Sequence, residues 1–335
     1  MPTSTLSIIA EAGVNHNGDL IMARELVHAA ADAGADVIKF QSFKAEDLVI
    51  ATADSAPYQQ RNTGQKNQLQ LLRALELDFE AFSELAALCR KRKIEFLCTA
   101  FDATTLPNLI GLGMRSIKIA SGELTNHPAI ALAASHKLPI LLSTGMATLA
   151  EVSDALSVIA DAGPVPVTVL HCTSLYPAPL NSLNLHAITT LRKSFGLPVG
   201  YSDHSLGEFA AIAAVALGAT VIEKHLTLST KLPGPDHGAS LDPAALKMMV
   251  GNLREISLAM GDGTKEPSSG ESETAKLVRR SWHSKRELKV GHRLDDGDIA
   301  LKRPADGLPP ANSPSGRTLA LGVGAGAPIR AEDLV

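Results

Sequence analysis

From Leu6 to about Met260, short apolar runs rich in Ile and Val alternate with longer Ala- and Leu-rich stretches of helical period. Short runs of this kind are typical of buried parallel strands, and the longer stretches are typical of helices that cover them. Eight strands with intervening helices in about 260 residues predict an α/β protein built on a (β/α)8 TIM barrel. The eight predicted strands lie at residues 7–12, 36–41, 95–100, 116–120, 139–143, 167–171, 198–202 and 219–225.

Two stretches interrupt this rhythm. Between Phe40 and Phe79 lies a polar connection that is longer than a simple crossover needs, and we expect it to lie over an active site. Residues 263–275 are polar, charged and rich in Gly and Ser, which predicts a linker rather than an element of regular structure. The barrel domain would then occupy residues 1–262. Residues 276–335 carry repeated turn signals and predict a small, mostly β domain.

Charge and composition narrow the class of protein. The 31 Lys and Arg residues against 35 Asp and Glu give a formal net charge of -4, so we expect no nucleic-acid partner and no attraction to an anionic membrane. No apolar stretch approaches the roughly 20 residues of a membrane span. Cys89, Cys98 and Cys172 follow no paired spacing, and the first residues lack the pattern of a secretory signal, so a cytoplasmic location is expected.

Polar side chains gather where the predicted strands end. In a TIM barrel the carboxyl ends of the strands face one pocket, so these residues predict a shared active site. Lys39 and Lys118, together with hydroxyl groups on neighbouring strands, favour a site for a phosphate or carboxylate group. For Lys39 taken alone, the alternative is a lysine that only extends from the barrel mouth to solvent. The strand-end set comprises Glu11, Lys39, Gln41, Thr99, Lys118, Ser121, Glu123, Ser143, Tyr176, Ser202, His204, Glu223 and His225.

His204 and His225 end successive strands, so both imidazoles can reach one ion. Two protein ligands leave open positions, which favours a catalytic divalent ion, Mn²⁺ or Mg²⁺, over a closed zinc site. Asp236, in the turn LPGPDHGAS, is a candidate base that would hold a metal-bound water. The alternatives are a helix capping box after His204, beginning at Ser205, and an Asp236 side chain that only bonds its own turn.

Glu11 and Glu123 are the acid-base candidates, because a carboxylate beside lysines and a metal can carry protons near neutral pH. Either glutamate could instead form a salt bridge with Lys39 or Lys118.

These residues lie inside motifs that resemble the sialic-acid synthase family, which includes N-acetylneuraminate, legionaminate and pseudaminate synthases. The motifs are IIAEAGVNHNGD (9–19), DVIKFQSF (36–43), KIASGELTNHP (118–128), LLSTGMAT (141–148), YPAP (176–179), GYSDHSLG (200–207), IEKHLTL (222–228) and GPDHGASLDP (234–243). The tail, including LKRPADG (301–307), resembles the antifreeze-like (SAF) domain that follows the barrel in these enzymes.

The resemblance implies a role for each matching residue. Asp236 would order a metal-bound water, and Glu123 would be the proton shuttle. A swapped small domain in a homodimer would bring Arg303 to the acetamido group of the partner's substrate. The phosphoenolpyruvate site would comprise Lys39, Thr99, Lys118, Ser121, Ser143 and Ser202, the sugar site Glu11, Gln41, Glu123, Tyr176 and Arg303, and the metal site His204 and His225.

The resemblance therefore implies a metal-dependent transferase that condenses phosphoenolpyruvate with N-acetylmannosamine or a related N-acetylated amino sugar, with release of phosphate and formation of a nine-carbon 2-keto acid such as N-acetylneuraminate. An N,N'-diacetyllegionaminate synthase is the alternative, because SGELTNHP and APYQQRNTG resemble legionaminate-type members. Two other classes stay open. One is a Schiff-base aldolase that uses Lys39 or Lys118 as nucleophile, and the other is a carbohydrate-binding protein without catalysis.

Overall fold

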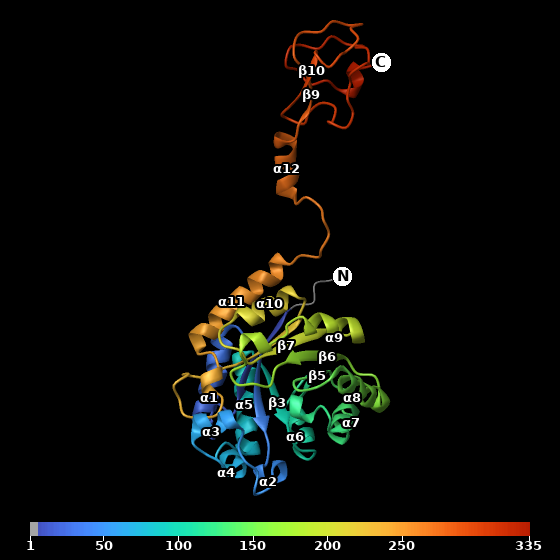
Figure 1. Ribbon diagram of the computed structural model, residues 1–335. Coiled ribbons are helices and arrows are strands. Elements are labelled where there is room, and N and C mark those ends of the chain that lie inside the picture. The colour runs from blue at the N-terminus through green and yellow to red at the C-terminus, as the bar shows by residue number, and fades with distance from the viewer. Residues whose placement is uncertain (1–5) are drawn as a thin grey trace. The chain divides into compact units, whose positions relative to one another are not determined.

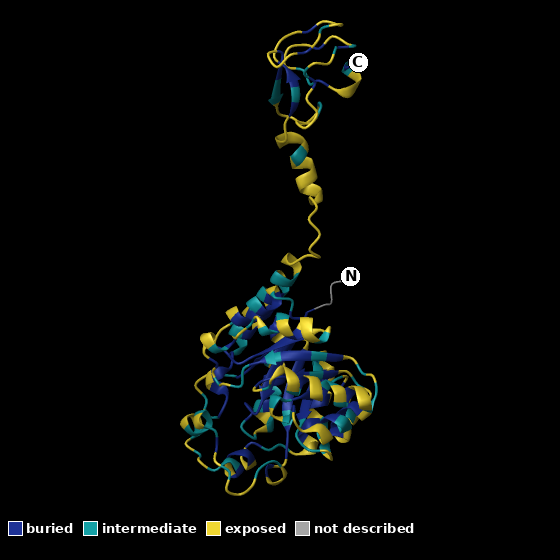
Figure 2. Cartoon of the chain, turned by 45° about the vertical axis from the view of Figure 1, so that its right-hand side comes forward, coloured by how far each residue is buried: buried dark blue, intermediate teal, exposed yellow. Residues whose placement is uncertain are grey.

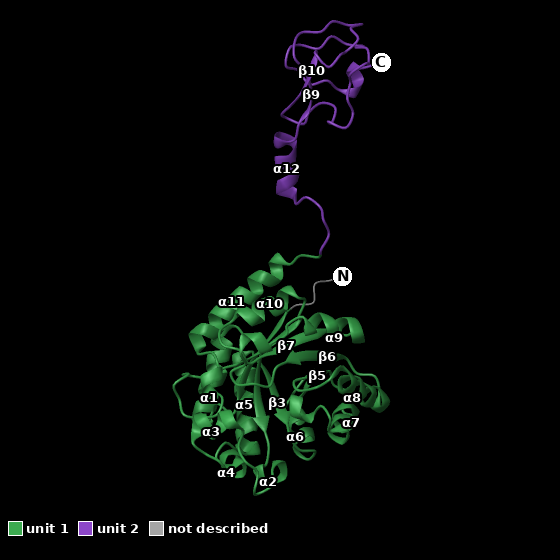
Figure 3. Cartoon of the chain, viewed as in Figure 1, with its two compact units in different colours: residues 1–262 green, residues 263–335 purple. Residues whose placement is uncertain are grey.

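The computed structural model describes residues 6–335. The chain divides into two compact units, residues 1–262 and 263–335, which Figure 3 colours separately. Each unit has its own apolar core, and the predicted linker at 263–275 falls within the second unit.

Unit 1 is an eight-stranded parallel barrel (Figure 1). The hydrogen-bonded order is β3-β2-β1-β8-β7-β6-β5-β4, and the end strands β3 and β4 lie in contact, so the sheet nearly closes on itself. All eight predicted strands are present, which confirms the TIM-barrel prediction. The strands are β1 (Ser7–Gly13), β2 (Val37–Ser42), β3 (Glu95–Ala100), β4 (Ile117–Ile119), β5 (Ile140–Ser143), β6 (Val167–Cys172), β7 (Val199–Asp203) and β8 (Val221–His225).

Helices cover the outside of the barrel and expose their polar faces (Figure 2). In α1 (Leu20–Ala33) the buried residues recur at helical spacing, Asp19 caps the first turn, and Gly34 ends the helix in the left-handed conformation. None of the described helices combines the length and apolar character needed to cross a membrane. The other outer helices are α5 (Phe79–Arg92), α6 (Thr105–Gly111), α7 (His127–Ser135), α8 (Leu149–Ala162), α9 (Ala187–Phe195), α10 (Phe209–Ala216) and α11 (Pro243–Ala259).

The long connection after β2 folds into three short helices, α2 (Ala45–Leu48), α3 (Pro57–Thr63) and α4 (Gln68–Arg73). It has an apolar cluster of its own, in which Phe43 and Leu72 pack with Val14 from the loop after β1. This cluster fixes the connection beside the carboxyl end of the barrel. The placement agrees with the expectation that it lies over a site.

Unit 2 begins with helix α12 (Ser269–Val278), which the prediction of an unstructured linker missed. The helix forms because Ser268 and Glu271 make a reciprocal capping box, although none of its residues is buried. The antiparallel strands β9 (Ser281–Ser284) and β10 (Ile299–Lys302) follow, and isolated bridges and turns complete the unit. Trp282 packs at the edge of its apolar core. The prediction of a small, mostly β domain is confirmed.

Candidate active site

A cavity of about 420 Å³ lies at the carboxyl ends of the strands, under the α2–α4 connection. Its walls bring together side chains that are far apart in the sequence, as the barrel prediction requires. Every predicted site residue except Glu123 and Arg303 lines it. Those in the walls are Glu11, Lys39, Gln41, Thr99, Lys118, Ser121, Ser143, Tyr176, Ser202, His204, His225 and Asp236.

A chain of opposite charges crosses the floor of the cavity. Lys39 Nζ lies 2.8 Å from Glu11 Oε2 and 3.8 Å from Glu223 Oε1, and Lys118 Nζ lies 3.8 Å from the same Glu223 oxygen. Ser202 Oγ donates to that oxygen at 3.0 Å. Glu223 therefore joins both lysines. The sequence shows Glu223 at the end of β8 but does not show its role, because that role depends on whether the side chain points into the cavity or away from it.

Burial and neighbouring charges set the state of these groups. Burial lowers the pKa of Lys39, but the Glu11 and Glu223 carboxylates outweigh this effect and hold the pKa above its usual value. The pKa of Lys118 is lowered by burial and by the Lys39 charge. Burial raises the pKa of Glu11. The Ser143 hydroxyl is buried without a hydrogen-bond partner. An anion that enters beside the lysines would meet both lysine side chains, whose charge the Glu11 and Glu223 carboxylates offset in part, and the free Ser143 hydroxyl.

The two strand-end histidines lie side by side, with ring centroids 5.5 Å apart. His204 Nδ1 lies 2.8 Å from the Thr173 carbonyl oxygen, so Nδ1 carries a proton and donates there, and Nε2 is the ring nitrogen that an ion could bind. The pKa of His225 lies well below its usual value because of burial and nearby cations, so its ring is neutral. Its Nδ1 is buried without a partner.

Burial lowers the pKa of His204, but the neighbouring Cys172 and the hydrogen bond to Thr173 raise it above its usual value. The donor set fits a divalent cation with two protein ligands, because binding of a cation would release the His204 proton and each imidazole then has a nitrogen free for the ion. No group of three or more His, Cys, Asp or Glu side chains that could enclose a metal occurs in residues 6–335. A closed structural zinc site is therefore not formed there, and any ion would keep open positions.

Asp236 lies in the segment after β8 and completes the wall beside the histidines. Its Oδ1 is buried without a partner, and burial raises its pKa to about 6. Asn15 Nδ2 donates to the Leu226 carbonyl and to Ser240 Oγ, and Ser240 Oγ donates to the Asp236 carbonyl. Asn62 Nδ2 donates to the Pro235 carbonyl. These bonds fix the segment while the carboxyl group of Asp236 stays free to act.

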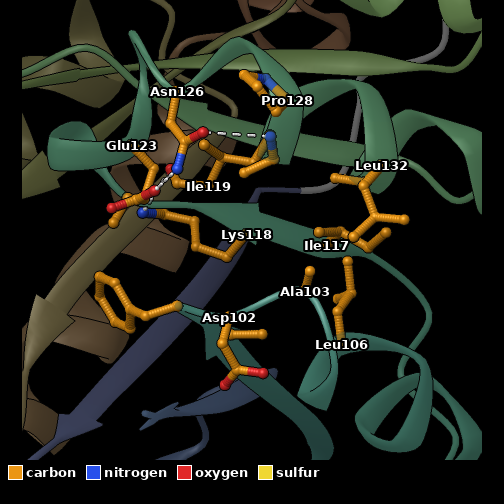
Figure 4. A pocket seen from close by; sticks show the side chains of 15 residues that line it. Asp102, Ala103, Leu106, Ile117, Lys118, Ile119, Glu123, Asn126, Pro128 and Leu132 are labelled. Carbon is orange, nitrogen blue, oxygen red and sulfur yellow. Dashed lines mark hydrogen bonds between the residues drawn. The ribbon is translucent and has the colours of Figure 1, made fainter. Parts of the chain in front are cut away.

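Glu123 lies apart from this cavity. It ends the 3-10 helix Ser121–Glu123 and accepts a hydrogen bond from Asn126, the N-cap residue of α7. Figure 4 shows it in the wall of a neighbouring, mainly apolar pocket of about 250 Å³, next to Lys118.

Two other predictions can be compared with the structure, the placement of Arg303 and the capping box after His204. Arg303 follows β10 in unit 2, which is a separate body. The alternative of a capping box after His204 is wrong, because α10 begins at Phe209 without a side-chain cap and Ser205 Oγ donates to Asp203.

Comparisons with known proteins agree with this architecture. The NeuB family model matches residues 26–265, and the SAF domain model matches residues 279–335. An N,N'-diacetyllegionaminic acid synthase of Campylobacter jejuni is 48% identical over 304 residues, which cover 90% of this chain and 91% of that protein. A protein of the same name from Legionella pneumophila is 46% identical, over 92% of this chain and 88% of that protein. The crystal structure of an N-acetylneuraminic acid synthetase from Leptospira borgpetersenii is similar, with a TM-score of 0.73 and 35% identity over 81% of this chain and 90% of that one.

Proposed function

The chain belongs to the NeuB family, and on that premise we propose that it condenses phosphoenolpyruvate with an N-acetylated amino sugar to give a nine-carbon 2-keto acid and phosphate. The observation that carries the proposal is the buried row of Lys39, Glu223 and Lys118 on the cavity floor beside the paired imidazoles. This row gives one end of the cavity the character of an anion site and leaves the other end free to bind a carbonyl compound.

The donor end comprises the lysines and the nearby hydroxyl groups. Phosphoenolpyruvate carries a phosphate and a carboxylate, and the two buried lysines are the cationic groups that would contact them, beside the Glu11 and Glu223 carboxylates. Thr99 Oγ1 lies 3.4 Å from Lys39 Nζ, and Ser121 Oγ accepts from the Gly145 amide at 2.9 Å, so the neighbouring hydroxyls are held in place before the donor arrives. Such fixed positions would lower the entropy cost of aligning donor and acceptor.

The acceptor end comprises His204, His225 and Tyr176, whose ring packs against the His204 imidazole at 4.2 Å. We propose that the two histidines hold Mn²⁺ or Mg²⁺, which would polarise the aldehyde group of the open-chain sugar. Gln41 donates to Glu11 at 2.7 Å, and this pair offers the sugar hydroxyl groups a hydrogen-bonding wall.

In the proposed reaction, C3 of phosphoenolpyruvate forms a bond to the aldehyde carbon, water adds to C2 of the donor, and the C2–O bond to phosphate then breaks. Asp236, with a pKa of about 6, is mostly ionised at neutral pH and is the group we assign to accept the proton of the water. We propose that the former aldehyde oxygen takes its proton from the Lys39–Glu11 pair, whose nitrogen and oxygen lie 2.8 Å apart.

The sugar is the finer part of the proposal. The motifs by themselves favour N-acetylmannosamine, with the legionaminate-type acceptor as the alternative. The relatives at 48% and 46% identity are both named N,N'-diacetyllegionaminic acid synthase, and this supports the second acceptor. We therefore propose the 2,4-diacetamido-6-deoxy analogue of N-acetylmannosamine as the preferred substrate.

The test is phosphate release from phosphoenolpyruvate with Mn²⁺, measured with each of the two sugars. We expect release with the 2,4-diacetamido-6-deoxy sugar, little with N-acetylmannosamine, and none in EDTA or in His225→Ala. A preference for N-acetylmannosamine would reverse the choice of acceptor. Release with neither sugar would contradict the proposed reaction.

A Schiff-base aldolase is the second candidate, and the lowered pKa of Lys118 favours it, because a neutral amine is the nucleophile in that chemistry. Borohydride reduction in the presence of pyruvate separates the two. A covalent adduct on Lys118 would support the aldolase, whereas the synthase forms none.

A further inference from the structure

Asp203 and Lys224 face each other across strands β7 and β8, and both side chains are fully buried. Side chains alternate along a strand, so this pair points to the opposite face from its neighbours. Ser202 and Glu223 precede the pair and line the cavity, and His204 and His225 follow it and also line the cavity. The ion pair therefore points away from the cavity, although the residues directly before and after it line the cavity.

The hydrogen bonds of the pair connect the residue before His204, which is Asp203, to the residue after it, which is Ser205. Lys224 Nζ donates to Asp203 Oδ2 at 2.7 Å and to the Ser205 carbonyl at 2.5 Å. Asp203 Oδ1 accepts from the Ser205 amide at 2.9 Å and from Ser205 Oγ at 2.7 Å. Tyr201 OH adds a third bond to this oxygen at 3.2 Å.

These bonds join the two histidines through their neighbours. Asp203 and Ser205 flank His204 and both bind Lys224, which is bonded covalently to His225. A rotation of the His204 backbone would break several buried hydrogen bonds, and a slip of β8 against β7 would break the ion pair. We propose that Asp203 and Lys224 are positioning residues that fix the spacing of the two imidazoles. This inference rests on the proposed function in one respect, the assignment of His204 and His225 as metal ligands.

Stability alone is a weak explanation for the pair. The attraction within a buried ion pair roughly offsets its desolvation cost, and well-packed apolar residues often replace such pairs without loss of stability. What apolar residues could not supply is the set of directed bonds to Ser205, which define the turn that carries His204.

The experiment uses the full chain with Lys224→Met, which keeps the length of the side chain and removes its charge and donors. Asp203→Asn is the second variant, since it keeps an acceptor for Ser205 and should fold if Lys224→Met does not. Arg254→Met is the control for the loss of an ion pair elsewhere in unit 1, although that pair is partly exposed. It removes an ion pair with Asp36 at 2.6 Å that ties α11 to the residue before β2, at the opposite end of the barrel.

Two quantities are measured on each folded variant. The first is the Kd for Mn²⁺, from the electron paramagnetic resonance signal of the free ion. The second is the set of imidazole nitrogen shifts of His204 and His225 in metal-free protein, assigned with single His→Gln variants. We expect Mn²⁺ binding to weaken about 10- to 100-fold in Lys224→Met, with altered shifts for both imidazoles, and neither change in Arg254→Met.

Unchanged imidazole shifts in both Asp203→Asn and Lys224→Met would overturn the inference, and so would Mn²⁺ affinities that fall equally in the control. If the parent protein bound no Mn²⁺, the proposed metal site would fail, but the imidazole shifts would still decide whether the pair positions the histidines.

Discussion

The Asp236 carboxyl group illustrates how a site residue can oppose the stability of the fold. Burial raises its pKa from 3.8 to about 6, and Oδ1 has no partner that repays the cost. A carboxyl group with a higher pKa in the folded state binds more protons there than in the unfolded chain. Its contribution to the free energy of unfolding therefore falls as the pH rises from about 4 to 6, and stays low above that range.

Asp236→Asn should therefore stabilise the protein at neutral pH while it removes the proposed base. We expect the free energy of unfolding to rise by about 1 to 3 kcal/mol at pH 7.5 and by less at pH 5, where the parent carboxyl is largely protonated. Urea unfolding in EDTA, followed by circular dichroism at both pH values, measures this. A gain of equal size at both pH values, or no gain at pH 7.5, would contradict the assigned cause.

Among single residues, the sequence predicted the site residues that lie at the ends of strands, because a side chain at a strand end of the barrel faces the cavity. Lys39 and His225 were found because all carboxyl ends of barrel strands converge. Glu223 received no role, and the pair of Asp203 and Lys224 was missed. Strands of a parallel barrel are buried on both faces, so a polar residue in β7 or β8 can point into the cavity or into the helix layer, and the pattern does not say which.

The loops between strands and helices show how closely the site is packed. The Gly145 amide donates to Ser121 Oγ at 2.9 Å. A Cβ atom at Gly145 would overlap the Ser174 hydroxyl and lie 2.8 Å from Ser121 Oγ. Only glycine lets the loop after β5 approach these two hydroxyls.

Gly145→Ala should displace the Ser121 hydroxyl of the proposed donor site and the Ser174 hydroxyl, which also lines the cavity. We expect the KM for phosphoenolpyruvate to rise about tenfold or more, because small displacements of positioning groups are costly. Gly111→Ala is the control, since no atom lies within 4 Å of the position a Cβ atom would take there. Steady-state kinetics of phosphate release measures both variants. Equal KM values for the two would show that the close contact does not position the donor.

The sequence predicted all eight strands of the barrel, but it did not predict every helix. The capping box that starts α12 is visible in the sequence at Ser268 and Glu271. The helix was missed because it buries no residue, and the prediction of an element depended on an apolar stripe. The segment between β2 and α5 was predicted to lie over a site, but its three short helices and its separate apolar cluster depend on contacts with the loop after β1.

For the whole molecule, we propose that unit 2 completes the active site of a second copy in a swapped homodimer. Unit 2 buries a core of its own around Leu288, Leu319 and Ile329. The resemblance assigns Arg303, in this unit, to the acetamido group of a partner's substrate.

Mixing two inactive variants tests the swap. His225→Ala damages the barrel and Arg303→Ala damages the small unit, and each should be inactive by itself. If the units act across a dimer, a mixed dimer contains one intact site, and random mixing should restore about a quarter of the parental activity. If each unit serves its own barrel, every site in a mixed dimer carries one defect, and phosphate release should stay absent.

The position of Trp282 gives unit 2 a spectroscopic label of its own. The sequence contains one tryptophan, and it lies partly buried at the edge of the small core, with its indole nitrogen 3.3 Å from the Pro310 carbonyl. Emission excited at the red edge of the indole band therefore reports on unit 2 alone. Docking of this unit on any surface, or its release when substrate enters, can be followed in the unmodified protein. Unfolding confined to the barrel would leave the emission at that excitation wavelength unchanged.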